Sequence, residues 1–311
     1  MSEAGGTKAV LAALGANAGI AAAKFLGFVF TGSSSMLAEA VHSLVDTSNQ
    51  GLLLLGRKKS KQRANQEHPF GFGRERFFYA FMVALLLFTL GAIFAIYEGI
   101  EKIANPHPLE SPVVALVILV LAVGLEGFSF RTAMRESREL RKGASLFSFI
   151  RRATVPELPV VLLEDSAALL GLLFALIGVG LSVLTGNPVW DGIGTVCIGS
   201  LLGVVAMVLI VEMKSLLIGE GAPPDVLATI VRELERETVQ RVIHIRTQYL
   251  GPEELLVAAK IALVPELTLA QVAAAIDAAE ARVRGAAPSA KLIYLEPDLD
   301  RTPVTVATAE A

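Results

Sequence analysis

Six long apolar stretches fill most of the first two thirds of the chain and restrict what it can fold into. Their approximate limits are residues 9–30, 36–56, 77–100, 113–130, 158–184 and 193–213. A helix needs roughly 20 mostly apolar residues to cross the hydrocarbon core of a bilayer, and each stretch is close to that length. The sequence therefore predicts a polytopic α-helical membrane protein with six transmembrane helices in a lipid bilayer.

Short polar connections join the first two and the last two stretches. Residues 31–35 and the turn Gly186-Asn187-Pro188 are typical of tight turns, which predicts antiparallel helical hairpins. The first stretch is too long for the apolar core of a signal peptide, contains Lys24 and is followed by no processing site. We therefore expect it to remain as the first helix.

Basic residues are concentrated in two of the connections, and this sets the expected orientation. The connections expected on the opposite side of the membrane contain one basic residue, Lys102. Under the positive-inside rule, this asymmetry predicts a multi-pass protein with both termini in the cytoplasm. The lack of a targeting peptide favours the inner membrane of a prokaryotic cell. Because both clusters flank membrane helices, binding of nucleic acid is disfavoured. The clusters are Arg57, Lys58, Lys59, Lys61, Arg63, Arg74 and Arg76, and then Arg131, Arg135, Arg138, Arg141, Lys142, Arg151 and Arg152.

Overall composition excludes two other classes of protein. Charged residues make up 18% of the chain and hydrophobic residues 53%, whereas soluble domains usually carry about 25% charged residues. This balance disfavours a water-soluble enzyme. The single cysteine, Cys197, excludes a disulfide framework and any metal site that needs several thiolates from one chain.

A soluble domain is expected after Gly219. Helical spacing begins after Pro223, residues 240–248 and 255–264 read as strands, residues 268–284 as a helix capped by Thr268, and residues 291–295 as a third strand. This order, α-β-β-α-β, predicts a cytoplasmic α+β ferredoxin-like domain. The predicted division is a six-helix transmembrane domain (1–218), a cytoplasmic ferredoxin-like domain (219–298) and a flexible tail (299–311).

Ionisable residues inside the apolar stretches are candidates for function, because they cost several kcal/mol at bilayer depth. Glu39, His42 and Asp46 are spaced i, i+3 and i+7, which places them on one helix face. The fifth stretch contributes the pair Glu164 and Asp165. Neither of these two stretches carries Lys or Arg at matching depth, so we expect uncompensated acids that form a divalent-cation site. The alternative is a buried hydrogen-bonded cluster that only ties the helices together.

Imidazole and carboxylate ligands suit zinc, with manganese, iron and cobalt as competitors. Metal binding requires neutral His42 and ionised carboxylates, so protons and metal compete for one site. The leading hypothesis is a secondary active transporter, not an enzyme, which exports a divalent cation against protons by alternating access. The alternatives are a non-transporting membrane metal sensor or scaffold, an exporter of organic cations, which the 6% aromatic content disfavours, and an intramembrane enzyme.

Two further acids have simpler interpretations. Asp191 opens the sixth stretch, where a carboxylate stabilises its own helix N-terminus, so we expect a cap. Glu126 is expected to line the cytoplasmic cavity or to pair with nearby basic residues.

Three motifs resemble one family of membrane proteins. Residues 31–46, which include Thr31-Gly32-Ser33-Ser34-Ser35 and the run from Leu37 to Asp46, resemble the second-helix signature of the cation diffusion facilitators. Residues 68–73 and 163–168 resemble the segment before the third helix and the fifth-helix motif of the branch related to the mitochondrial zinc transporter. The resemblance implies a homodimer, formed through the cytoplasmic domain and membrane helices, that exports zinc or a similar metal in exchange for protons.

The resemblance also implies ligands. His42, Asp46 and Asp165 match three ligands of the family's transport site, while the usual position of the fourth is Val161. Glu164 is the natural substitute, and a water, Asn17 or Glu39 could complete the shell instead. His68 matches a loop histidine that binds a second metal in some members. In the cytoplasmic domain only His244 is present, with Lys260 and Tyr294 at common histidine positions, so dimerisation without the full zinc-sensing cluster is expected.

Overall fold

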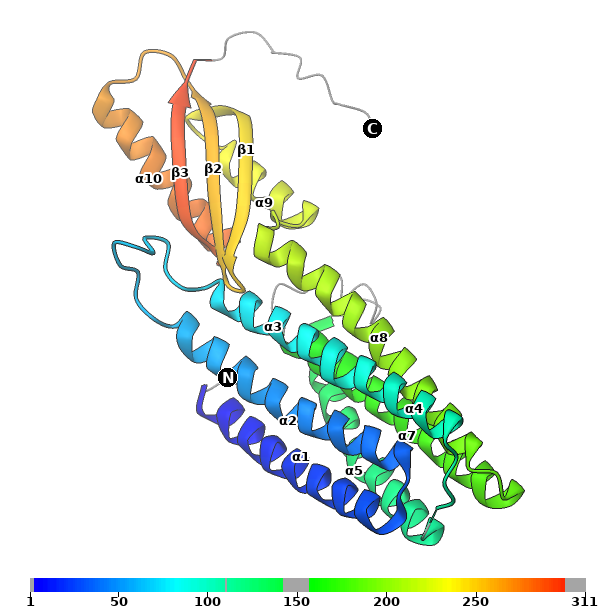
Figure 1. The fold of residues 1–311 in the computed structure, drawn as a ribbon. Helices are drawn as coiled ribbons and strands as arrows, with labels where there is room; N and C mark the ends of the chain where they lie inside the picture. Colours follow the sequence, from blue (N-terminus) through cyan, green and yellow to red (C-terminus); the bar gives the residue numbers. More distant parts are fainter. Residues whose placement is uncertain (1–2, 110, 142–156, 300–311) are drawn as a thin grey trace, which may run out of the picture. The chain divides into compact units, whose positions relative to one another are not determined.

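The computed structural model describes residues 3–109, 111–141 and 157–299. The chain forms two compact units, Met1–Leu217 and Ile218–Ala311. The first contains the long helices and the second the sheet (Figure 1). Lys142, Arg151 and Arg152 of the predicted second basic cluster, and the predicted tail from residue 300 onward, lie outside the described residues.

Each of the six apolar stretches is helical. The helices of the first unit run alternately in opposite directions along the bundle (Figure 1). Between α2 and α5, one rod consists of α3, a π-helical turn and α4, whereas the sequence predicts a single α-helix there. The bounds are α1 Glu3–Thr31, α2 Ser34–Ser60, α3 Glu75–Leu86, η1 Leu87–Ile93, α4 Phe94–Ala104, α5 Pro112–Arg141, α7 Glu157–Thr185 and α8 Val189–Ile218.

Within the described residues, three helices are long and apolar enough to cross a membrane by length and composition: Glu75–Ala104, Pro159–Thr185 and Val189–Ile218. Asn17–Thr31 and Pro112–Phe128 are shorter apolar helical segments. The helix α2 is not among them, because ionisable residues lie within its apolar stretch and basic residues occupy its last turn. The number of membrane crossings therefore stays a prediction.

The helix α5 is longer than predicted, since it continues from residue 130 to Arg141. The basic residues of this segment predict a connection between helices. Arg, Glu and Leu are good helix formers, so the helix continues where the apolar stretch stops. Loss of hydrophobicity therefore marks the end of an apolar span, but it does not mark the end of the helix.

Two glycines make the predicted hairpin turns possible. Gly32, between α1 and α2, has φ of 61°, and Gly186, between α7 and α8, has φ of 66°. Both lie in the left-handed region that residues with a Cβ rarely adopt. After the first turn, Ser33 caps α2 by accepting a hydrogen bond from the backbone N–H of Met36.

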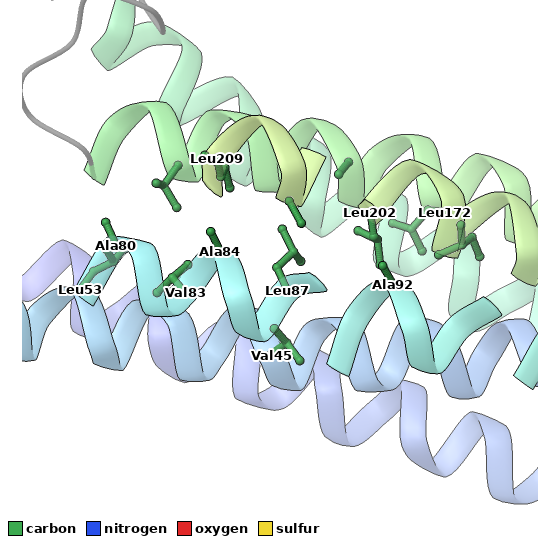
Figure 2. Close-up of a cluster of buried hydrophobic side chains, with 14 of the residues drawn as sticks. Val45, Leu53, Ala80, Val83, Ala84, Leu87, Ala92, Leu172, Leu202 and Leu209 are labelled. Atoms are coloured by element: carbon green, nitrogen blue, oxygen red, sulfur yellow. The ribbon is translucent and has the colours of Figure 1, made fainter. Parts of the chain in front are cut away.

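Apolar side chains and close backbone contacts hold the bundle together. Val45, Leu87, Leu172 and Leu202, from four different elements, belong to one buried cluster (Figure 2). On α8, a Cβ added at Gly199 would lie 2.8 Å from the backbone nitrogen of Ile96 and 2.9 Å from the carbonyl oxygen of Ala92. The helix α8 and the α3–α4 rod therefore touch backbone to backbone.

The second unit contains a three-stranded sheet with two helices. Strand order is β1-β2-β3, with β1 and β2 antiparallel and β2 and β3 parallel. Buried side chains from both helices and the sheet form its core. The order of elements agrees with the prediction, and the ferredoxin-like classification stays a prediction. The bounds are α9 Pro224–Leu234, β1 Val239–Gly251, β2 Glu254–Leu263, α10 Leu269–Ala286 and β3 Ala290–Asp298.

The start of α10 confirms the predicted cap. The Thr268 side chain accepts from the backbone N–H of Gln271, and the Gln271 side chain accepts from the backbone N–H of Thr268. This reciprocal pair satisfies two backbone donors that a helix N-terminus otherwise leaves without partners.

Candidate metal centre

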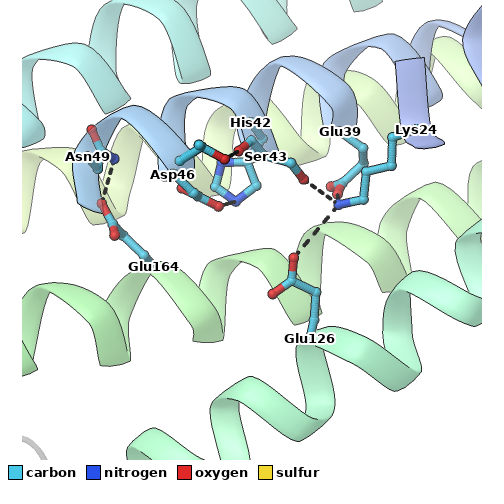
Figure 3. Close-up of polar contacts among 9 residues, drawn as sticks. Lys24, Glu39, His42, Ser43, Asp46, Asn49, Glu126 and Glu164 are labelled. Carbon is cyan, nitrogen blue, oxygen red and sulfur yellow. Dashed lines mark hydrogen bonds and ion pairs between the residues drawn. The ribbon is translucent and has the colours of Figure 1, made fainter. Parts of the chain in front are cut away.

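The three residues predicted on one face of α2 are buried, and so is Asn49. Glu39, His42, Asp46 and Asn49 are at most 8% exposed, although the described part of the chain has many exposed apolar side chains. Each lies three or four residues from the next, so the four side chains form one stripe along the helix. Figure 3 shows this stripe with groups from the neighbouring helices beside it.

His42 and Asp46 form the pair that their spacing predicts. The Nε2 atom of His42 lies 3.5 Å from Oδ2 of Asp46. Three buried atoms of this pair make no hydrogen bond among the described residues: both ring nitrogens of His42 and the Oδ1 atom of Asp46. Buried polar atoms are rarely left this way. One imidazole nitrogen and the carboxylate oxygens are therefore available together as ligands.

Glu164 reaches the same stripe from α7. Its Oε1 atom accepts a hydrogen bond of 2.7 Å from the Nδ2 atom of Asn49, so the carboxylate is directed toward α2 (Figure 3). Asp165 is buried as well, at 8% exposure. The partnership of Asn49 with Glu164 was not predicted, because a sequence does not show which side chains of two packed helices face each other.

The ligands do not yet surround one point. Among the described residues, no three His, Cys, Asp or Glu side chains are close enough to hold a metal ion together. The structure thus brings together two pairs, His42 with Asp46 and Asn49 with Glu164.

Lys24 corrects the expectation of an uncompensated acid at Glu39, because it supplies the counter-ion of that carboxylate. Its Nζ atom lies 3.0 Å from Oε2 of Glu39 and 3.9 Å from Oε1 of Glu126, and it donates to Oγ of Ser43 at 2.8 Å. Lys24 is on α1, whereas the expectation concerned basic residues within the second and fifth stretches only. A basic residue inside an apolar stretch is itself a signal of function, and that signal could have identified Lys24.

Asp191 lies in the first turn of α8, as predicted, and has a second role. Its carboxylate accepts hydrogen bonds from the backbone N–H of Ser34 at 3.0 Å and from the hydroxyls of Ser33, Ser34 and Ser35. These serines begin α2. Asp191 therefore caps the helix that carries the metal candidates, in addition to standing in the first turn of α8.

Two further candidates, Asn17 and His68, lie apart from this stripe. Asn17 is half-buried on α1. His68 is in the exposed loop before α3, where its ring lies 4.5 Å from that of Phe72 and its backbone N–H donates to Asn65. No hydrogen bond or ion pair described in the structure joins either residue to His42 or Asp46.

In the second unit, Lys260 stands at a position where the resemblance implies a histidine, and it forms ion pairs there. His244 on β1 is paired in register with Lys260 on β2. The ammonium of Lys260 lies 3.0 Å from Glu296 and 3.2 Å from Asp298. Hydrogen bonds to these two carboxylates raise the pKa of Lys260 above its usual value. Lys260 is therefore a fixed positive charge on this sheet.

Comparison with known proteins identifies the family. Residues 10–218 match the family model of the cation efflux transmembrane domain. The chain belongs to the cation efflux family, also called the cation diffusion facilitators, which confirms the resemblance seen in its motifs. The members of this family are transporters rather than enzymes.

Named relatives have related descriptions. The human mitochondrial proton-coupled zinc antiporter SLC30A9 is 38% identical over 223 residues, which are 71% of this chain and 39% of that protein. Metal tolerance protein C4 of Arabidopsis thaliana is 30% identical over 249 residues, which are 79% of this chain and 54% of that protein. The matched region thus spans about two fifths to one half of these relatives. The structure of a MamM CTD covers 25% of this chain and 100% of the MamM chain, with 26% identity and a TM-score of 0.24.

Proposed function

We propose that the chain is a proton-coupled antiporter that exports divalent metal cations, with zinc as the main substrate. Alternating access moves the cation from the cytoplasm to the opposite side of the membrane. In this proposal His42, Asp46, Asp165 and Glu164 are the ligands of the transported ion, and Glu164 takes the place of the ligand that Val161 cannot supply.

The observation that carries the proposal is the buried His42–Asp46 pair. The Nε2 atom of His42 and the Oδ2 atom of Asp46 are 3.5 Å apart. Both ring nitrogens of His42 and Oδ1 of Asp46 make no hydrogen bond among the described residues. A divalent cation would satisfy these atoms, and a combination of nitrogen and oxygen ligands suits zinc. Glu164 is held toward α2 by Asn49, which lies three residues after Asp46 on the same face of the helix.

Exchange for protons follows from the same ligands. An ion binds only when His42 is neutral and the carboxylates are ionised, so binding releases protons and protonation releases the ion. A site that opens alternately to two compartments would then couple the flow of metal to the opposite flow of protons. The 38% identical human relative SLC30A9 is a proton-coupled zinc antiporter, which supports coupling to protons in this chain.

Orientation and assembly complete the proposal. Basic residues in the connection after α2 favour the cytoplasmic face of the membrane. The bundle then lies in the cell inner membrane with both termini in the cytoplasm. The corresponding face of a mitochondrial inner membrane is the alternative that the mitochondrial relatives suggest. We infer a homodimer that forms through the C-terminal domain and the membrane helices, as the family resemblance implies.

Zinc flux in proteoliposomes tests the function. We expect purified protein to move zinc when a proton gradient is imposed and to lose most of the flux when the gradient is collapsed with an ionophore. Binding of zinc without flux under any gradient would instead identify a membrane metal sensor or scaffold. Competition by manganese, iron and cobalt in the same assay ranks the cations that the site accepts.

A further inference from the structure

A fully buried lysine lies where three oxygen atoms converge. Lys24 on α1 is 0% exposed. Its Nζ atom contacts Glu39 Oε2 at 3.0 Å, Ser43 Oγ at 2.8 Å and Glu126 Oε1 at 3.9 Å, and these atoms come from α2 and α5. Figure 3 shows the ammonium between the two carboxylates. We call Lys24, Glu39, Ser43 and Glu126 the lysine cluster.

The carboxylate of Glu39 is tightly enclosed. Its Oε1 atom makes no hydrogen bond among the described residues, and a Cβ added at Gly171 of α7 would lie 2.7 Å from it. Glu39 therefore fits at this depth because residue 171 has no side chain. The lysine cluster sits where α1, α2, α5 and α7 meet, and its carboxylates are more than nine-tenths buried.

Charge decides what the lysine cluster can hold. Two carboxylates and a hydroxyl within 3.9 Å of one point form an oxygen-rich set of the kind that magnesium, calcium and manganese prefer. A buried charge without a partner is strongly unfavourable. The ammonium of Lys24 supplies that partner, so a mobile cation gains little at this position.

The lysine cluster lies beside the proposed transport site. Glu39 is one turn before His42 on α2, and Ser43 is the next residue after His42. A cation that entered the bundle would meet both sets of ligands along the same helix. The two sets differ because the oxygen atoms of the lysine cluster already surround a positive charge of the chain itself, the ammonium of Lys24.

We propose that Lys24 is a built-in cation that fills the oxygen ligands of Glu39, Ser43 and Glu126 and thereby confines divalent cations to the His42–Asp46 pair. Lys24 is then a specificity-determining residue, because it closes a site that would favour hard cations over zinc. This inference rests on the proposed function only for the identity of the neighbouring transport site.

Manganese binding tests the proposal directly, since Mn²⁺ is paramagnetic and prefers oxygen ligands. We would titrate the full-length protein in detergent with Mn²⁺ and count bound ions by electron paramagnetic resonance. Lys24→Gln should bind one more Mn²⁺ per chain than the unaltered protein. Lys24→Arg, which keeps the charge, should bind no extra ion, and Lys24→Gln combined with Glu126→Gln should lose the extra ion again.

A folded Lys24→Gln variant that binds no additional Mn²⁺ would overturn the proposal. If that variant fails to fold, Glu126→Gln alone remains decisive: it should bind as much zinc as the unaltered protein, and loss of bound zinc would make Glu126 a ligand and contradict the proposal. Failure of the proposed function would give a different result, because the unaltered protein would then neither bind nor move zinc. The count of Mn²⁺ bound by Lys24→Gln is a separate measurement and does not depend on that result.

Discussion

The carboxylate of Asp191, in the first turn of α8, accepts a hydrogen bond of 3.0 Å from the backbone N–H of Ser34, the first residue of α2. The two residues are far apart in the sequence, and both are buried. Through this bond, one helix fixes the start of another that carries the metal candidates. The position of His42 and Asp46 along the bundle therefore depends on α8 as well as on α2.

Replacement of Asp191 with alanine tests this cap. Asp191→Ala leaves the backbone N–H of Ser34 buried without its acceptor, which costs about 1–3 kcal/mol. We expect a lower midpoint of thermal unfolding for the detergent-solubilised protein. Ser200→Ala is the matched control on α8, because the exposed Ser200 hydroxyl donates to the carbonyl of Val196 in its own helix. Equal midpoints for the two variants would show that Asp191 does not hold the start of α2.

Removal of the Asn49 side chain tests how Glu164 is positioned. Asn49→Ala loses the 2.7 Å hydrogen bond to Glu164, and partners of metal ligands typically affect affinity by about 10–100-fold. We expect zinc affinity, measured by calorimetric titration, to weaken within that range. Ser48→Ala is the control, since Ser48 is exposed on the same helix and bonds to a backbone carbonyl. An unchanged affinity in Asn49→Ala would remove Glu164 from the proposed shell.

The close contact between α8 and the α3–α4 rod predicts opposite outcomes for two glycines on one helix. At Gly199 an added Cβ would meet backbone atoms at 2.8 and 2.9 Å, whereas at Gly203 the nearest atom would be a Cβ at 3.6 Å. Gly199→Ala should therefore destabilise the protein by about 1–3 kcal/mol through overpacking. Gly203→Ala should be neutral or stabilising, because alanine favours helix over glycine. Thermal unfolding of both variants distinguishes these outcomes.

The ion pairs of Lys260 predict how the second unit responds to alkaline pH. Because Glu296 and Asp298 raise the pKa of Lys260 from 10.5, these contacts contribute fully below the unfolded pKa and lose their contribution as pH rises through the folded pKa. Lys260→Gln should therefore lower the unfolding midpoint of the full chain at neutral pH. The difference from the unaltered protein should shrink above pH 10.5. A difference that is constant across this range would exclude the charge as its cause.

Local signals predicted the positions of the elements well. The helical stripe of Glu39, His42 and Asp46, the cap at Thr268 and the turn at Gly186 each depend on neighbours in sequence, and the structure contains all three. The predicted end of α5 was wrong, because residues with high helix propensity extend the helix beyond the apolar stretch to Arg141. Periodicity locates a helix more reliably than it locates the end of that helix.

Contacts between distant helices were the part that the sequence could not reveal. Lys24 was visible as a charge, but its partners Glu39 and Glu126 depend on how α1, α2 and α5 pack. The same holds for Asp191 with Ser34 and for Asn49 with Glu164. Each pair couples residues more than ten positions apart, and nothing in the local pattern specifies such a pairing.

Zinc transport by variants of the buried pair tests the central claim most directly. In proteoliposomes with an imposed proton gradient, we predict that the unaltered protein and Ser48→Ala move zinc, while His42→Ala and Asp46→Ala fall to the rate of protein-free liposomes. All four proteins must be reconstituted to equal density and be equally monodisperse in detergent. Zinc flux at the unaltered rate in both His42→Ala and Asp46→Ala would contradict the assignment of this pair as the transport site.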